Sequence, residues 1–95
     1  MILARVLGNV ITSVRVDNIE GAVYKIIAPC SSDGSVIQEG IVALDLIGAA
    51  PGEFVIVSQG SSTRQTEFTK DKPVDAVIMG IVDIVEEEDK VVFQK

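Results

Sequence analysis

Residues 2–16 read ILARVLGNVITSVRV, and this stretch decides the fold class. Successive side chains sort onto two faces with a period of two, which is the pattern of a β-strand. Gly8 stands near the middle, and a glycine inside a strand permits a sharp bend or a bulge. We therefore predict one long strand over residues 2–16 that bends at Gly8 and serves two parts of a closed sheet. One face of this strand holds Ile2, Ala4, Val6, Gly8, Val10, Thr12, Val14 and Val16.

Further runs rich in β-branched residues predict strands at 22–28, 41–45, 53–59 and 76–85. The run 76–85 is apolar on both faces, which is typical of a strand buried on both sides. In so short a chain the second covering layer could be a neighbouring subunit. Residues 91–93 are expected to pair back across the acidic turn 86–89.

The turn signals between these strands fall at regular intervals. Asp17-Asn18 with Gly21 closes the first strand, 31–34 forms a hairpin turn, and 48–52 is a loop by composition. Only residues 61–68 favour a helix, with Ser61 or Ser62 as its cap. The pattern predicts a mainly β fold: a small closed five-stranded OB-like β-barrel with one short helix.

Composition narrows the function classes. The chain has 95 residues, a formal net charge of -6, no histidine and a single cysteine. This length predicts one domain. Histidine, the commonest general base and metal ligand, is missing. A single thiol cannot form an internal disulfide. An acidic surface repels the phosphate backbone of nucleic acid. No stretch reaches the ~20 apolar residues of a membrane span. We expect a soluble cytoplasmic protein that binds neither nucleic acid nor membrane.

The hydrophobic fraction is high for a small domain. It is 47%, although only four residues are aromatic. A chain of this size buries only roughly two thirds of its unfolded surface. Part of the Val, Ile and Leu should therefore stay exposed as an apolar patch, and such patches usually mark an interface. Composition thus favours an oligomer.

Candidate chemistry is sparse. The segment 60–64 could hold an anion at a helix start, but without the lysine of a phosphate loop a capped helix is the better interpretation. Asp45, Asp75 and Asp83 could do acid–base work if two of them met, yet no nucleophile accompanies them. We interpret them as structural carboxylates that pair with arginine or cap backbone amides.

Two further features receive plain interpretations. The run 86–89 lacks the spaced ligands and glycine of a calcium loop, and it is typical of a solvated turn. Cys30 has no basic neighbour in sequence that would activate it, so we expect a packing role. The residues alone therefore indicate no catalytic site, no metal site and no cofactor.

An ordered set of short motifs resembles one known family. The motifs follow one another in order from residue 4 to residue 83, so the resemblance covers essentially the whole chain, and the spacing between them also matches. They are Ala4-Arg5-Val6 with Gly8; Ala43, Asp45, Ile47-Gly48-Ala49 and Gly52-Glu53; Val57, Gly60-Ser61-Ser62 and Arg64; Pro73-Val74-Asp75; and Gly80-Ile81-Val82-Asp83. The set is similar to the EutN/CcmL family of pentameric vertex proteins in bacterial microcompartment shells. Two departures are Ala50-Pro51 in a loop that is usually glycine-rich as Gly-Ala-Gly, and Thr63 where the family usually has alanine.

The resemblance implies a structural role. Family members fold as small β-barrels with a short helix and close into fivefold rings that cap the corners of polyhedral shells, with hexameric shell proteins on the facets. It implies that residues 1–95 form a single vertex domain that is not an enzyme and lies in the shell of a microcompartment such as a carboxysome. Gly48, Ala49, Ser61 and Ser62, which are small and lie in tight segments, are expected nearest the fivefold axis. Arg5 and Arg64 are expected to pair with Asp45, Asp75 or Asp83 within or between subunits.

One alternative from another class stays open. An OB-like barrel can also grip single-stranded nucleic acid or a small ligand. Such barrels use basic grooves and exposed aromatic side chains, and this chain has few of either.

Overall fold

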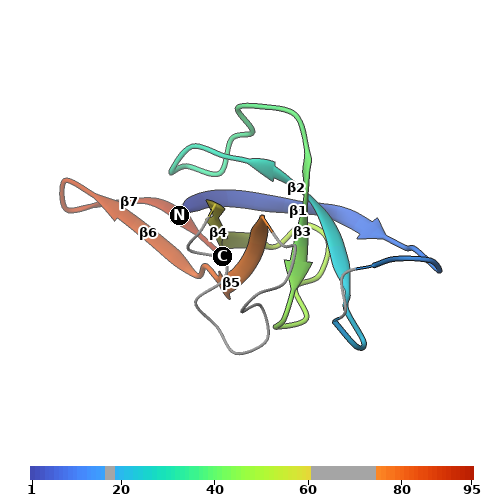
Figure 1. Ribbon diagram of the computed structural model, residues 1–95. Helices are drawn as coiled ribbons and strands as arrows, with labels where there is room; N and C mark the ends of the chain where they lie inside the picture. The colour runs from blue at the N-terminus through green and yellow to red at the C-terminus, as the bar shows by residue number, and fades with distance from the viewer. Residues whose placement is uncertain (17–18, 61–74) are drawn as a thin grey trace.

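Five strands close into a barrel in the computed structural model, which describes residues 1–16, 19–60 and 75–95 (Figure 1). The barrel order is β1-β2-β3-β5-β4, with β3 and β5 parallel and the other neighbours antiparallel. Two further strands, β6 and β7, pair only with each other. The strands are β1 Ile2–Val10, β2 Tyr24–Pro29, β3 Ile41–Asp45, β4 Phe54–Gln59, β5 Ala76–Ile81, β6 Ile84–Glu87 and β7 Lys90–Gln94.

The first strand serves two sides of the barrel, as predicted. Its residues 2–5 pair with β4, and residues 4–10 pair with β2. The register against β2 shifts between Val6 and Gly8, where glycine accommodates the irregularity. The prediction of a closed five-stranded barrel is thus confirmed. The helix predicted over 61–68 lies outside the described residues.

The first strand is shorter than predicted, because it ends at Val10 and not at Val16. Val10 is opposite Tyr24, which is the first residue of β2. Beyond that point neither described neighbour of β1 continues, so the ladder has no further partner. The prediction of the strand end from the alternation of side chains was therefore wrong.

The predicted strand over residues 76–85 is also wrong in its extent. The strand is interrupted at Val82 and Asp83, which separate β5 from β6. The Val82 amide donates to the Phe54 carbonyl at 2.8 Å, which keeps this residue on the barrel. After that, β6 turns away and forms a hairpin with β7 (Figure 1). The predicted return pairing of residues 91–93 is confirmed.

The core lies inside the barrel and is built from small and β-branched side chains. A second cluster packs on the outside, where Ile19 covers Leu44 and Val77 beside the half-buried Ala22 and Tyr24. Apolar side chains therefore pack on both faces of β3 and β5 near the place where these two strands pair in parallel. The barrel cluster consists of Ala4, Val6, Ile27, Ala43, Ala49, Val55, Val57, Ala76 and Ile78.

The β6-β7 turn carries an unfavourable sequence for its geometry. Glu88 and Asp89 both have positive φ, at 51° and 63°. A two-residue turn of this kind favours Asn-Gly, because a side chain in the left-handed region costs roughly 1–2 kcal/mol. We expect E88N/D89G to stabilise the hairpin by about 1 kcal/mol, measured as slower hydrogen exchange of the amides in residues 84–94. A matched control, E86Q/E88Q, also removes two charges but leaves the turn preference unimproved. Equal protection in the two variants would show that turn geometry is not the cause.

Candidate functional site

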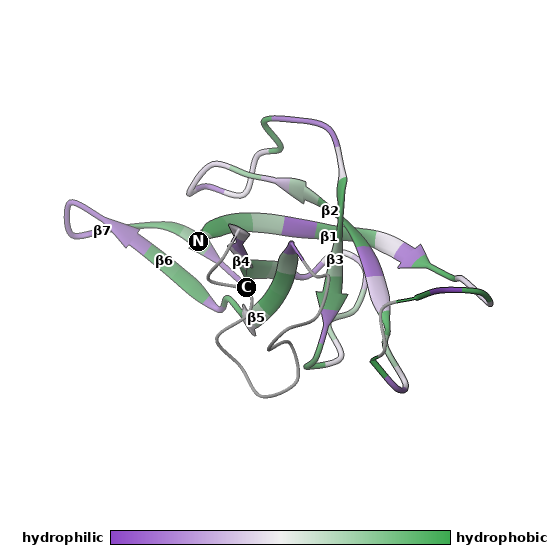
Figure 2. Cartoon of the chain, viewed as in Figure 1, coloured by the Kyte–Doolittle hydropathy of each residue, from purple (hydrophilic) through white to green (hydrophobic). Residues whose placement is uncertain are grey.

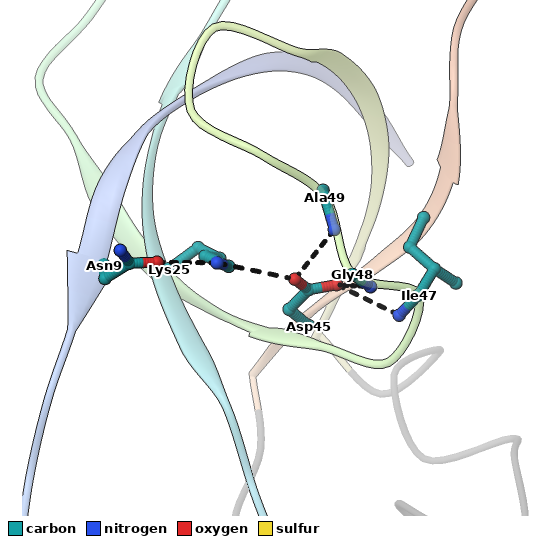
Figure 3. A network of polar contacts seen from close by, with 6 residues as sticks. All are labelled: Asn9, Lys25, Asp45, Ile47, Gly48 and Ala49. Atoms are coloured by element: carbon teal, nitrogen blue, oxygen red, sulfur yellow. Dashed lines mark hydrogen bonds and ion pairs between the residues drawn. The ribbon is translucent and has the colours of Figure 1, made fainter.

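Asp45 organises the loop that follows β3. Its Oδ1 accepts the amides of Ile47 and Gly48 at 3.0 and 2.9 Å, and its Oδ2 accepts the amide of Ala49 at 2.9 Å (Figure 3). An aspartate can accept hydrogen bonds from the backbone amides of the residues that follow it. These bonds form a side-chain turn and replace the strand-to-strand hydrogen bonds that end with β3. The loop is thereby folded back so that the Ala49 methyl group joins the barrel core, while Gly48 stays exposed.

A lysine and an asparagine extend this network across three strands. Lys25 Nζ on β2 lies 3.9 Å from Asp45 Oδ2 and donates to Asn9 Oδ1 on β1 at 2.6 Å (Figure 3). The Asp45 side chain is 1% exposed and the Lys25 side chain is 12% exposed. A buried carboxylate whose oxygens accept several hydrogen bonds has a structural role. This geometry matches the interpretation of Asp45 as a carboxylate that caps amides.

Arg5 joins the barrel to the hairpin. Its Nη1 donates to the Gly52 carbonyl at 3.0 Å, and its Nη2 donates to the Gly34 carbonyl at 3.2 Å. The guanidinium lies 5.4 Å from the Phe54 ring centre and 5.8 Å from that of Phe93. The two rings are themselves 4.3 Å apart. Within the chain, Arg5 therefore binds carbonyl groups and aromatic faces, and its pairing with an aspartate of another subunit stays a prediction.

The hairpin has further anchors, two at its base and one beside its turn. Lys95 Nζ lies 3.1 Å from a carboxylate oxygen of Glu53, and the Lys95 amide donates to the Asp83 carbonyl at 2.8 Å. The two Lys95 contacts fix where the hairpin leaves the barrel. At the opposite end of the hairpin, next to its turn, the Glu87 carboxylate accepts the Ser32 hydroxyl and holds the tip to the turn after β2.

The other residues predicted for a site are dispersed. Asp75 and Asp83 are exposed, unlike Asp45, and their backbone carbonyls accept the amides of Gly60 and Lys95. Ser61, Ser62 and Arg64 lie outside the described residues. Sequence reasoning singled out Asp45 and Arg5 but missed their partners. An Asp-x-x-Gly at the end of a strand signals the Asp45 turn, whereas nothing local signals Lys25 or Phe93.

Polar contacts hold the turn after β2. Asp33 accepts hydrogen bonds from the hydroxyl groups of Ser35 and Ser31 and from the Ser35 amide, and these donors lower its pKa to about 2. Cys30 precedes this turn, and its thiol donates to the Ala28 carbonyl at 3.2 Å. Burial raises the pKa of the Cys30 thiol, which disfavours the reactive thiolate.

Exposed apolar side chains are the largest feature that the fold leaves unexplained. Ile11, Val14 and Val16 are 93%, 86% and 88% exposed beyond the end of β1. Figure 2 shows apolar stretches on elements that project from the barrel. Such a surplus on a small domain is typical of an assembly surface. The remaining exposed large hydrophobic residues are Met1, Leu7, Val23, Val36, Ile37, Val42, Leu46, Ile47, Met79, Ile81, Ile84 and Val91.

The described residues offer little for ligand chemistry. Over residues 1–16, 19–60 and 75–95, no three acidic, cysteine or histidine side chains gather as a metal site would require. Phe54 is buried, and Tyr24 and Phe93 are half-buried, so these rings form no open stacking platform. In the same part of the chain no helix is long and apolar enough to cross a membrane.

Comparison with known proteins gives consistent matches. The family model described as ethanolamine utilisation protein EutN/carboxysome matches residues 1–83. The chain is 37% identical to the microcompartment shell vertex protein EutN of Salmonella typhimurium over 95 residues, which cover 100% of this chain and 96% of that protein. Among solved structures, CcmL of Nostoc sp. PCC 7120 superposes with a TM-score of 0.92 at 30% identity, covering 100% of both chains.

A pentameric relative has the same fold. The GrpN pentameric microcompartment shell protein of Rhodospirillum rubrum superposes with a TM-score of 0.81 at 34% identity, covering 92% of this chain and 99% of that one. The barrel, the motif order and these matches lead to one conclusion: this chain belongs to the EutN/CcmL family.

Proposed function

We propose that this protein assembles as a homopentamer that caps the fivefold vertices of a polyhedral bacterial microcompartment and allows its shell to close. The observation that carries the proposal is the match over the full chain, in sequence and fold, to shell vertex proteins and pentameric shell proteins. Residues 1–95 act as one vertex domain, which is a structural component of the shell and not an enzyme.

The exposed apolar surface supports this role. A cyclic ring of identical chains uses a heterologous interface, in which one face of each subunit meets a different face of the next. The exposed Val and Ile side chains would be covered in such a ring, whereas they would be a liability on a monomer. A flat layer of hexamers gains curvature where a pentamer replaces a hexamer, so we propose hexameric shell proteins as partners.

The residues predicted near the axis and in ion pairs are part of this proposal. Gly48 and Ala49 lie in the loop that Asp45 holds, and the exposed Gly48 has no side chain that would obstruct a crowded symmetry axis. We propose that this loop, with Ser61 and Ser62, lies nearest the fivefold axis. Asp45 is buried and accepts three amides of its own loop, so its predicted role stays within the subunit. Pairing of Arg5 or Arg64 with Asp75 or Asp83 of another subunit is proposed as an additional contact.

Two measurements test the function. Native mass should be about 50 kDa, as five copies of the 10.1-kDa chain require. Co-expression with a hexameric shell protein should then give closed polyhedral particles in electron micrographs, while omission of this chain should give open or elongated assemblies. A stable monomer, or particles that close equally well without the chain, would contradict the proposal.

A further inference from the structure

Two projecting elements lie at opposite ends of the subunit (Figure 1). One is the arm, defined as residues 11–16, which continues past the end of β1. The other is the hairpin, defined as β6-β7. The subunit measures 44 × 24 × 21 Å, so its length is about twice its width. The arm and the hairpin of one subunit are therefore separated by most of the long dimension.

The arm packs little against the part of its own chain that the structure describes. Its three large apolar residues, Ile11, Val14 and Val16, are the most exposed hydrophobic side chains described, at 86–93%. Two of its side-chain hydrogen bonds are local: the Thr12 hydroxyl donates to the Val14 carbonyl at 3.0 Å, and Arg15 donates to the Ile19 carbonyl at 3.1 Å. Burying such side chains contributes roughly 1.5–3 kcal/mol each. The arm is thus suited to pack on a second surface.

The hairpin is only partly covered by its own chain. Phe93 packs on the barrel and Glu87 at the tip accepts the Ser32 hydroxyl, but the two strands pair only with each other, and a two-stranded sheet is marginally stable alone in water. Ile84 and Val91 are 52% and 53% exposed on it. An apolar segment laid against these side chains would complete a hydrophobic layer and stabilise the hairpin.

The two elements carry opposite charge. The arm contains Arg15 and no acidic residue, and Asp17 follows it directly in the sequence. The hairpin tip has the sequence Glu86-Glu87-Glu88-Asp89, followed by Lys90. Figure 2 shows this tip as strongly hydrophilic. Charge complementarity of this kind fixes which surfaces meet and in what orientation.

We propose that the arm of one subunit packs against the hairpin of the next subunit in the ring. This inference rests on the proposed function, because it assigns the contact that closes the pentamer. Ile11, Val14 and Val16 cover Ile84 and Val91, and the Arg15 guanidinium faces the acidic tip. Each subunit contributes one arm and one hairpin, which are different surfaces, as a heterologous ring requires.

Cross-linking tests the contact directly. In a C30A background, V14C/V91C places one thiol in the arm and one in the hairpin. The control V14C/V42C moves the second thiol to β3, where Val42 is 50% exposed and thus matches Val91 at 53%. The reagent is a short, flexible bis-maleimide. Because the arm and the hairpin lie at opposite ends of one subunit, each link between them must join two subunits.

The expected result is a ladder of species up to a covalent pentamer for V14C/V91C, and little cross-linking for V14C/V42C. A wild-type pentamer whose two cysteine variants cross-link equally, or not at all, would overturn the inference and leave the vertex function standing. A wild-type monomer would instead contradict the proposed function itself, so the two failures are distinguishable.

A second variant measures the strength of the contact. V14D places a carboxylate opposite the acidic hairpin tip and should raise the subunit concentration at which the pentamer dissociates by at least tenfold. V42D should not change that concentration. Val14 has little packing in its own chain, so far-UV circular dichroism should show an unchanged barrel. Dissociation caused by V42D and not by V14D would overturn the inference.

Discussion

Replacement of Asp45 by alanine is expected to lower the free energy of unfolding by about 4 kcal/mol. The substitution removes the acceptor of three backbone amides and leaves Lys25 as a nearly buried charge that has lost its carboxylate partner. An unsatisfied buried donor costs roughly 1–3 kcal/mol, and the amide of Ala49 is the most buried of the three. The loop 46–50 would then lose its fixed shape, and Ala49 would leave the core.

Two further variants separate this network from a simple loss of charge. D45N keeps one carbonyl oxygen for the amides of Ile47 and Gly48 but places an NH2 donor where Oδ2 accepted the Ala49 amide, so it should recover only part of the loss. D83N removes a negative charge from an exposed bend and should change stability by less than about 0.5 kcal/mol. The measurement is urea unfolding at one fixed protomer concentration, because the stability of an oligomer depends on concentration. Equal unfolding midpoints for D45A and D83N would show that the network is not stabilising.

The strands of the barrel were the most predictable part of the fold. Residues 41–45 were predicted as a strand and form β3 with the same limits, because a β-branched run ends there at an aspartate and a glycine loop. The bulge near Gly8 was equally readable, since a glycine inside an alternating pattern commonly marks a bulge or a bend. Local pattern succeeds where the residues that decide the structure are neighbours in sequence.

Strand ends were less predictable because they depend on the partner. Val14 and Val16 continue the alternation of β1, yet no strand remains beside them in the described chain. Residues 76–85 form a largely apolar run, but the barrel uses it as a strand only as far as Ile81. In both places the run contains apolar side chains that stay exposed in the described part of the chain, and in the proposed ring a neighbouring subunit would cover them. These errors therefore point to the same elements that project from the subunit.

The Arg5 cluster was beyond sequence reasoning for a different reason. Its contacts connect Arg5 with Gly34, Gly52, Phe54 and Phe93, which are separated by up to 88 positions in the chain. The arginine was expected to pair with an aspartate, because opposite charge is the simplest rule. In the barrel it instead meets two carbonyl groups and two aromatic faces, since the closure of the sheet brings those groups to one point.

Replacement of Arg5 by alanine is expected to release the hairpin while the barrel stays folded. The guanidinium contacts the turn after β2, the loop before β4 and the ring of Phe93 on β7 at the same time. Its two hydrogen bonds from a charged donor and its contact with the rings together contribute about 2 kcal/mol to hairpin docking at this half-buried position. Hydrogen exchange of the amides in residues 84–94 should accelerate by roughly thirtyfold, as that free energy implies.

The pattern of variants distinguishes docking from general destabilisation. R5K keeps a positive charge but cannot reach both carbonyl groups with one planar fork, so its effect on residues 84–94 should be intermediate. Amides of β2 and β4 inside the barrel should exchange at nearly unchanged rates in both variants. A uniform acceleration over the whole chain, with no excess in the hairpin, would mean that Arg5 supports the barrel as a whole. Because the hairpin is proposed to receive the arm of the next subunit, R5A should also weaken the pentamer, and native mass spectrometry on dilution should show more free monomer than for the wild type.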